Sequence, residues 1–334
     1  MAIDIPFGQR LLRRAEVRNL SMEDWYPEAL AAIATRLGVS FTDLAPPRSR
    51  RLRTPRGPDI HALDWGGLGP SAVLLHGGAL TARTWDYVAL GLRADFRIVA
   101  LDLRGHGASD WANDYSMESC ATDVASVLDG LAIERMHVAG MSLGGIVACE
   151  FALRHPDRTA SLTMVDVVSR PIFAATARMR GFISDFRSAS TIDEVVEMAL
   201  AVSPKSDPQR LHYRMQVLLK RGRDGRLIWK SDRRRPTDFA AILRHLAGFE
   251  ARVHEMPAPF LLTRGGDSLI VTEDAAHNFT ARFPNGRWLN IPGAGHNVQE
   301  DNPRELANAM RDFWGGRLPC MTLEDVEHCT AQDG

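Results

Sequence analysis

The sequence predicts an α/β protein with a mostly parallel sheet, helices on both faces of that sheet, and a helical cap inserted between two strands. Three observations support this. Continuously apolar runs alternate with helical patterns from residue 71 onward, glycine-rich turns follow several of these runs, and the alternation stops after residue 168 and resumes near residue 259. Apolar strands separated by helices are typical of a parallel sheet buried on both faces.

Residues 1–58 precede this pattern and are expected to form an N-terminal extension. Within it, Pro27 to Leu37 is predicted to be a short helix, because proline lies near its start and Gly38 follows its end. Residues 46–58 are basic and interrupted by prolines, which favours an exposed connector. A nucleic-acid contact is the alternative for this basic run.

The core is predicted at residues 59–169 and 258–316. Each predicted helix there carries apolar residues at helical spacing, and each strand is a short apolar run. The strands are expected at Ser71–His76, Arg97–Leu103, Met136–Met141, Leu162–Val168, Pro259–Thr263 and Arg287–Ile291, and the helices at Met117–Leu131, Gly144–Arg154 and Pro303–Trp314. Connections between parallel strands are nearly always right-handed crossovers, and ligands bind at the carboxyl ends of such strands.

Residues 170–257 are predicted to form the cap, because they contain helical patterns such as Ile192–Val202 and Leu211–Lys220 but few strand-like runs. Residues 317–334 follow the last core helix as a tail. Four aromatic or methionine side chains at the start of the cap are candidates for lining a substrate pocket, with packing inside the cap as the alternative for each. They are Phe173, Met179, Phe182 and Phe186.

Composition limits the classes of partner. The formal net charge of −1 gives no long-range attraction to nucleic acid or to an anionic membrane, and neither partner is expected. A small-molecule substrate fits this charge balance, although the balance does not single one out. The four cysteines have no metal-ligand spacing and are interpreted as reduced thiols of a cytoplasmic protein. The first 20 residues hold no continuous apolar run, and no stretch approaches the ~18 apolar residues of a membrane span.

Ser142 is the predicted nucleophile. It lies in Gly140-Met141-Ser142-Leu143-Gly144, a G-x-S-x-G pattern that follows a predicted strand and opens a predicted helix. The sharp turn exposes the hydroxyl, and the N–H groups at the start of the helix favour negative charge beside it.

A serine hydroxyl needs an adjacent base, and His296 is the predicted one. It follows the last predicted strand in Pro292-Gly293-Ala294-Gly295-His296, which brings it to the same sheet edge as Ser142.

The histidine in turn needs a carboxylate to fix its tautomer. Asp267 is predicted to supply it, because it follows the strand Pro259–Thr263 and gives the chain order serine, aspartate, histidine. Asp166, at the end of the strand before the cap, is the rival.

The donors to a substrate oxyanion are predicted to be the backbone N–H groups of Leu143 and Gly78. Leu143 directly follows the nucleophile, and Gly78 lies in the His76-Gly77-Gly78 turn. His76 is interpreted as a structural residue that bonds across loops. The segment Asp102–Asp110 is interpreted as a rigid loop held by ion pairs and glycine turns, without a direct catalytic role.

Together these pieces resemble the α/β-hydrolase superfamily. The matching segments are HGG at 76–78, DLRGHGASD at 102–110, GMSLGG at 140–145, GGD at 265–267 and GAGH at 293–296. The resemblance covers about residues 60–315. It implies an eight-stranded sheet, a cap after the sixth strand, and neither metal nor cofactor.

Within that superfamily, Ser142 argues against epoxide hydrolases and haloalkane dehalogenases, which carry aspartate at the nucleophile position. Carbon–carbon bond hydrolases use serine but usually have tryptophan after the catalytic histidine, where this chain has Asn297. Hydrolysis of a carboxylic ester or lactone through an acyl-enzyme is therefore the preferred function. A carbon–carbon bond or amide hydrolase with the same triad and a non-catalytic receptor are the alternatives. A covering role and a homodimer contact are both open for the N-terminal extension.

Overall fold

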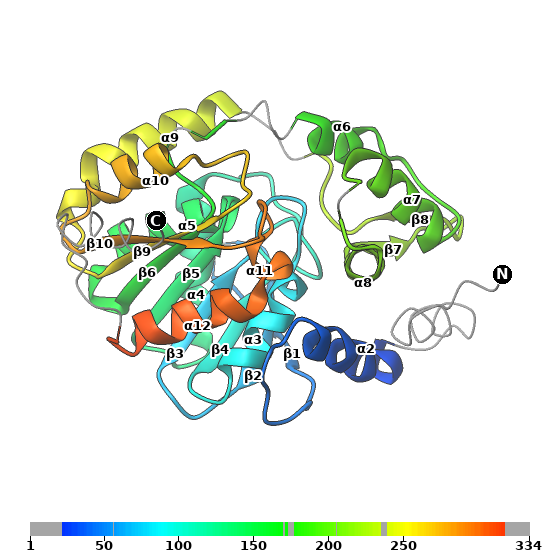
Figure 1. Cartoon of the computed structure of the whole chain (residues 1–334), viewed down its shortest axis with the longest axis horizontal. Coiled ribbons are helices and arrows are strands. Elements are labelled where there is room, and N and C mark those ends of the chain that lie inside the picture. Colours follow the sequence, from blue (N-terminus) through cyan, green and yellow to red (C-terminus); the bar gives the residue numbers. More distant parts are fainter. Residues whose placement is uncertain are drawn as a thin grey trace, which may run out of the picture.

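The computed structural model describes residues 22–55, 57–169, 171–172, 177–204, 206–234 and 239–317. Its centre is an eight-stranded sheet with the order β1-β2-β4-β3-β5-β6-β9-β10 (Figure 1). β2 runs antiparallel to both of its neighbours, and the other neighbouring pairs are parallel. The strands are β1 (Arg48–Leu52), β2 (Ile60–Gly66), β3 (Ser71–Leu75), β4 (Arg97–Leu101), β5 (Met136–Met141), β6 (Thr159–Val165), β9 (Phe260–Gly265) and β10 (Gly286–Ile291).

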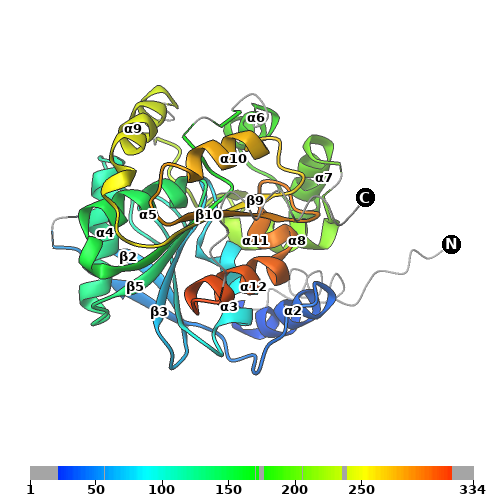
Figure 2. The ribbon, with the colours of Figure 1, turned by 60° about the vertical axis from the view of Figure 1, so that its left-hand side comes forward.

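The predicted core strands are confirmed as β3, β4, β5, β6, β9 and β10, with ends that shift by a few residues. Helices cover both faces of the sheet, and each face buries its own apolar cluster (Figure 2). One cluster contains residues of α3 (Asp86–Leu92) and α12 (Pro303–Trp314), and the other contains residues of α4 (Met117–Gly130), α5 (Leu143–Arg154) and α10 (Glu273–Thr280). None of the helices in the described part of the chain combines the length and apolarity that a membrane crossing requires.

The N-terminal extension contributes a helix and a strand to this core. α2 (Met22–Arg36) covers the predicted helix except for Leu37, but it begins at Met22 and has Pro27 inside it. The predicted exposed connector is wrong for Arg48–Leu52, which pairs along its whole length with β2 as the edge strand of the sheet. Its side chains are mostly exposed, as the basic sequence suggested, and only the backbone is engaged.

In its described residues the inserted segment forms a cap of three α-helices and a hairpin. α6 (Ala177–Asp185), α7 (Ile192–Val202), α8 (Pro208–Leu218), β7 (Leu219–Arg221) and β8 (Leu227–Trp229) lie together at one side of the sheet (Figure 1). Lys220, predicted at the end of a helix, is therefore in β7.

The predicted cap of 170–257 is too long at its C-terminal end. α9 (Phe239–Arg252) lies over the sheet and packs against α5, apart from the cap helices (Figure 1). Leu246 and Phe249 of α9 are buried among the core residues of that face. α9 thus serves as the crossover helix that leads into β9.

Candidate active site

The turn at Ser142 has the sharp geometry that the sequence predicts. Ser142 lies between β5 and α5 with φ 51° and ψ −115°, a backbone conformation that is costly for a residue with a side chain. Its N–H donates to the carbonyl of Val165 at 3.1 Å. Gly144 allows the tight packing that follows, because a Cβ at this position would lie 2.2 Å from the carbonyl oxygen of Leu75.

His296 is bonded to Asp166. Its Nδ1 lies 2.8 Å from Asp166 Oδ2, and an ionised carboxylate can only accept, so Nδ1 carries the proton. In the neutral imidazole with this tautomer, Nε2 is the nitrogen that can accept a proton, as a base requires. His296 and Ser142 line the same cavity, His296 from the loop after β10 and Ser142 from the turn after β5.

Asp166 is held rigidly at the end of β6. It is fully buried, and its φ of 49° turns its side chain away from the path of the strand. Besides His296, its carboxylate accepts the backbone N–H of Gly265 at 3.0 Å and the hydroxyl of Ser268 at 2.6 Å. Three donors around one carboxylate fix its orientation.

The prediction of Asp267 as the partner of His296 is corrected by this geometry. Asp267 is exposed, and its described contact is made by its backbone N–H, which donates to Ala294 O at 2.9 Å. β6 lies between β5 and β9, so the residue after β6 is next to the nucleophile turn. The weaker candidate at sequence level, Asp166, occupies the place predicted for Asp267.

The Gly265-Gly266-Asp267 segment has a main-chain role instead. The loop that carries His296 must cross the end of β9 to reach Asp166. A Cβ at Gly265 would lie 2.2 Å from Gly295 O, so only glycine allows this crossing. Gly266 N–H donates to Ile291 O at 2.8 Å and holds the two loops together. Sequence reasoning missed Ser268, although it directly follows this motif.

The predicted oxyanion donors border the same cavity. Gly78 lines it, and Leu143 is the first residue of α5, where a backbone N–H has no acceptor within the helix. The loop of Gly78 is fixed by two histidines. His106 Nε2 accepts the N–H of Ala79 at 3.3 Å, and His76 Nε2 accepts the N–H of Leu103 at 2.9 Å. His76 thus bonds across loops, as expected.

The Asp102–Asp110 segment is the ion-paired loop that the sequence predicts. The guanidinium of Arg104 binds both carboxylate oxygens of Asp123, at 2.6 and 2.8 Å. Asp102 accepts the N–H groups of Ala82 at 2.7 Å and Ala108 at 2.9 Å. None of these groups lines the cavity of Ser142.

The cavity beside Ser142 has a volume of about 120 Å³ and lies between the core and the cap, with residues of both in its walls. Its walls are mainly apolar, and Asn297 lines it next to His296. The apolar lining includes Leu80, Met141, Phe182, Ile183, Leu211, Met215, Leu218 and Trp229.

Two of the four predicted lining residues can be placed. Phe182 lines the cavity, whereas Phe186 is buried in the cap, with its ring 5.0 Å from that of Trp229. The prediction for Phe186 is therefore wrong, and the alternative of packing within the cap holds. Phe173 and the side chain of Met179 lie outside the described residues.

Arg214 adds a charge to this cavity, which the sequence did not indicate. It lines the wall from α8 and forms an ion pair with Glu300, close to the loop of His296. Burial alone would lower the pKa of Arg214, but the Glu300 carboxylate more than offsets this and the pKa is raised. Arg214 is therefore a cation at every physiological pH. No group of three metal-binding side chains occurs among the residues with described positions.

Comparison with known proteins agrees with this geometry. Residues 70–303 match the family model of the alpha/beta hydrolase fold. Esterase Rv0045c of Mycobacterium tuberculosis is 34% identical over 262 residues, which cover 75% of this chain and 85% of the relative. A solved structure of that esterase aligns with a TM-score of 0.71 at 32% identity, covering 86% of this chain and 98% of the other.

A second group of relatives comprises pimeloyl-[acyl-carrier protein] methyl ester esterases. The protein of Vibrio vulnificus is 39% identical over 258 residues, covering 75% of this chain and 96% of the relative. The chain belongs to the α/β-hydrolase family. Within this family it is a serine hydrolase of the esterase type.

Proposed function

We propose that Ser142 is the nucleophile, His296 the general base and Asp166 the orienting acid in the hydrolysis of a small carboxylic ester or lactone. The observation that carries this proposal is the 2.8 Å bond between His296 Nδ1 and Asp166 Oδ2, because His296 lines the same cavity as Ser142. In the first step Ser142 Oγ attacks the ester carbonyl, and its proton passes to His296 Nε2.

The tetrahedral intermediate places its negative oxygen near the N–H groups of Gly78 and Leu143. Its collapse expels the alcohol, which takes the proton from His296, and leaves an acyl group on Ser142. Water activated by His296 then releases the acid. A cavity of about 120 Å³ is small compared with the ~300–1,000 Å³ of most ligand pockets, which favours a compact acyl group. The apolar walls favour an acyl chain with few polar atoms.

The esterase names of the relatives support this reading over carbon–carbon bond or amide hydrolysis and over a receptor role. Asn297 lines the cavity directly after the catalytic histidine, which also distinguishes this chain from the carbon–carbon bond hydrolases it resembles. A cytoplasmic location is part of the same proposal and fits Cys120 and Cys149, which are buried and not joined in a disulfide.

Labelling with a fluorophosphonate probe tests the nucleophile. Wild-type protein should be labelled, and Ser142→Ala should lose both labelling and about 10⁵- to 10⁶-fold of its ester turnover while keeping its melting temperature. A panel of esters, lactones and amides with graded acyl size then tests the bond that is cleaved. Labelling that persists in Ser142→Ala would show that another residue is the nucleophile.

A further inference from the structure

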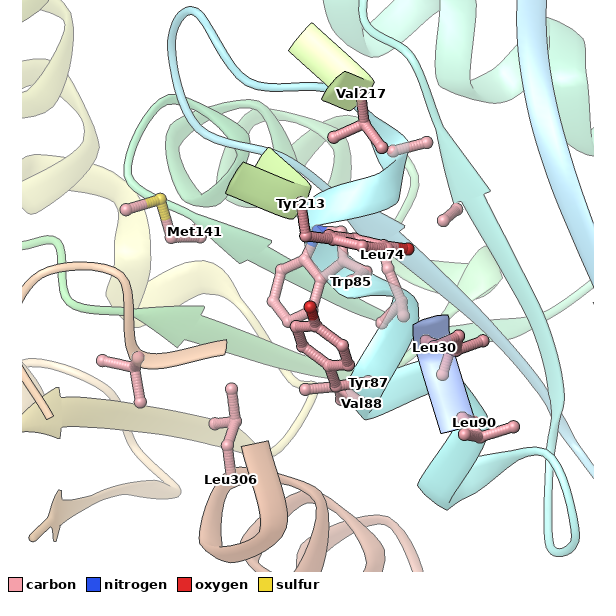
Figure 3. Packing of buried hydrophobic residues seen from close by; sticks show 14 of the residues in the cluster. Leu30, Leu74, Trp85, Tyr87, Val88, Leu90, Met141, Tyr213, Val217 and Leu306 are labelled. Atoms are coloured by element: carbon pink, nitrogen blue, oxygen red, sulfur yellow. The ribbon is translucent and has the colours of Figure 1, made fainter. Parts of the chain in front are cut away.

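The helix α8 forms a wall of the cavity with one face and packs on the core with the opposite face. Residues at three- and four-residue spacing on α8 line the cavity: Leu211, Arg214, Met215 and Leu218. Tyr213 points from the other face into the core, and its hydroxyl donates to Asp86 at 2.6 Å. Figure 3 shows Tyr213 beside Trp85 and Tyr87 of the core, with Leu30 of α2 in the same cluster. The position of α8 therefore sets the shape of the cavity.

α2, from the N-terminal extension, holds α8 at two points. The guanidinium of Arg36 binds both carboxylate oxygens of Asp207, at 2.6 and 3.1 Å. Asp207 is the N-cap residue of α8 and accepts the N–H of Arg210 at 2.8 Å. Further along, the rings of Tyr26 and Tyr213 are stacked at 6.3 Å.

The electrostatics agree with a specific contact at the first point. Burial alone would raise the pKa of Asp207, but the hydrogen bonds from Arg36 and from the N–H of Arg210 reverse this and the pKa is lowered. A two-pronged arginine–carboxylate pair also fixes direction, which a single contact does not.

α2 is itself fixed to the core. Leu30 and Ile33 are fully buried, and α2 packs against α3. Arg83, in the short 3₁₀ helix Ala82–Trp85 just before α3, lies over the ring of Tyr26 at 4.2 Å. α2 precedes residue 70, where the match to the family model begins. A helix outside the family core therefore connects that core to the wall of the substrate cavity.

We propose that α2 is a positioning element for substrate selection: through Arg36–Asp207 and Tyr26–Tyr213 it sets where α8 stands over Ser142, and so which acyl groups fit. This inference rests on the proposed function, because it takes the cavity beside Ser142 to be the acyl site. Neither Arg36 nor Tyr26 touches substrate. Both act through α8.

Arg36→Glu in the full chain is the direct test, because it replaces the ion pair with repulsion at a half-exposed site where folding is not at risk. The ratio of kcat/KM for a long and a short p-nitrophenyl ester should change by about threefold or more. Arg36→Lys, which keeps the charge, should stay nearer to wild type. The matched control is Arg317→Glu, which breaks the exposed Arg317–Asp312 pair far from α8.

A double-mutant cycle ties the effect to the ion pair. Asp207→Asn removes the charge but retains an N-cap oxygen. If the pair is the route, Arg36→Met and Asp207→Asn should each shift the ester ratio, and the double variant should shift it no further than either one. Unchanged ester ratios in Arg36→Glu, or additive shifts in the cycle, would overturn the proposal. Fluorophosphonate labelling distinguishes failure of the proposed function from failure of this inference. If wild type is not labelled, the proposed function fails. If wild type is labelled but the ester ratios are unaltered in the variants, only the role of α2 is refuted.

Discussion

The contacts of Asp166 explain why this residue, and not Asp267, is the carboxylate that binds His296. Its carboxylate accepts from His296, Gly265 and Ser268, and it is completely buried. A carboxylate in this setting can orient the imidazole and stabilise its charged form during the reaction. Asp267, one residue before Ser268, is exposed on the same loop.

This contrast predicts opposite outcomes for two isosteric changes. Asp166→Asn should lower kcat by about 10³- to 10⁴-fold, because an amide can bond to the histidine in the wrong tautomer. Asp267→Asn should change kcat by no more than roughly twofold, as is usual for an exposed site. Steady-state kinetics on one aryl ester measures both, and a larger loss in Asp267→Asn would restore the sequence-based choice.

The sequence could place Ser142 and His296 but not the acid, for a physical reason. A nucleophile elbow is a local structure, so five consecutive residues are enough to specify it. The acid depends on which strand ends beside the histidine loop, and this follows from sheet order. In the sheet, β6 lies between β5 and β9, and the loop after β10 reaches across β9 because Gly265 has no side chain.

At the scale of elements, the same distinction explains the extension and the cap. The buried strands can be predicted from their apolar runs. β1 has no such run, because it is an edge strand with exposed, mostly charged side chains and pairs through its backbone. α9 has a helical pattern like those of the cap helices, and only its packing on α5 assigns it to the core. Helical periodicity shows that one face of a helix is buried, but it does not show which element that face packs against.

Phe182 lines the cavity and Phe186 packs inside the cap, so substitutions at these two positions should have different effects. Phe182→Ala should change the preference between long and short acyl esters by roughly tenfold or more, because an apolar wall shapes the acyl site. Phe186→Ala should leave the preference unchanged but destabilise the protein by about 3–5 kcal/mol, because its buried ring packs on Trp229.

Relative turnover on a graded ester series and thermal melting measure these two effects. Each variant is the control for the other, because both replace a phenylalanine with alanine. Phe182 lies in α6, and Phe186 directly follows it. If Phe182→Ala only lowers the melting temperature, the cap does not select substrates through this residue.

At the scale of the whole molecule, Asp102 joins parts that are far apart in the chain. Its carboxylate accepts from His61 Nδ1 at 2.8 Å, from Ala82 N–H and from Ala108 N–H, and so links β2 to the loops after β3 and β4. Burial alone would raise the pKa of Asp102, but the hydrogen bond and charge of His61 outweigh it and bring the pKa to about 2.

A pKa of about 2 in the folded protein, against ~3.9 in the unfolded chain, fixes the sign of the pH effect. Between these values the unfolded chain binds more protons, so the contribution of Asp102 is complete above pH ~4 and falls as the pH drops toward 2. It amounts to ~2–3 kcal/mol near neutral pH, of which about 1 kcal/mol is lost by pH 3. The difference in unfolding free energy between wild type and Asp102→Asn should therefore shrink as the pH falls from 5 toward 3. Urea unfolding across this range measures it, with the exposed Asp267→Asn as a control that should follow wild type. A difference that stays constant down to pH 3 would mean that Asp102 stabilises the fold through its shape and hydrogen bonds and not through its charge.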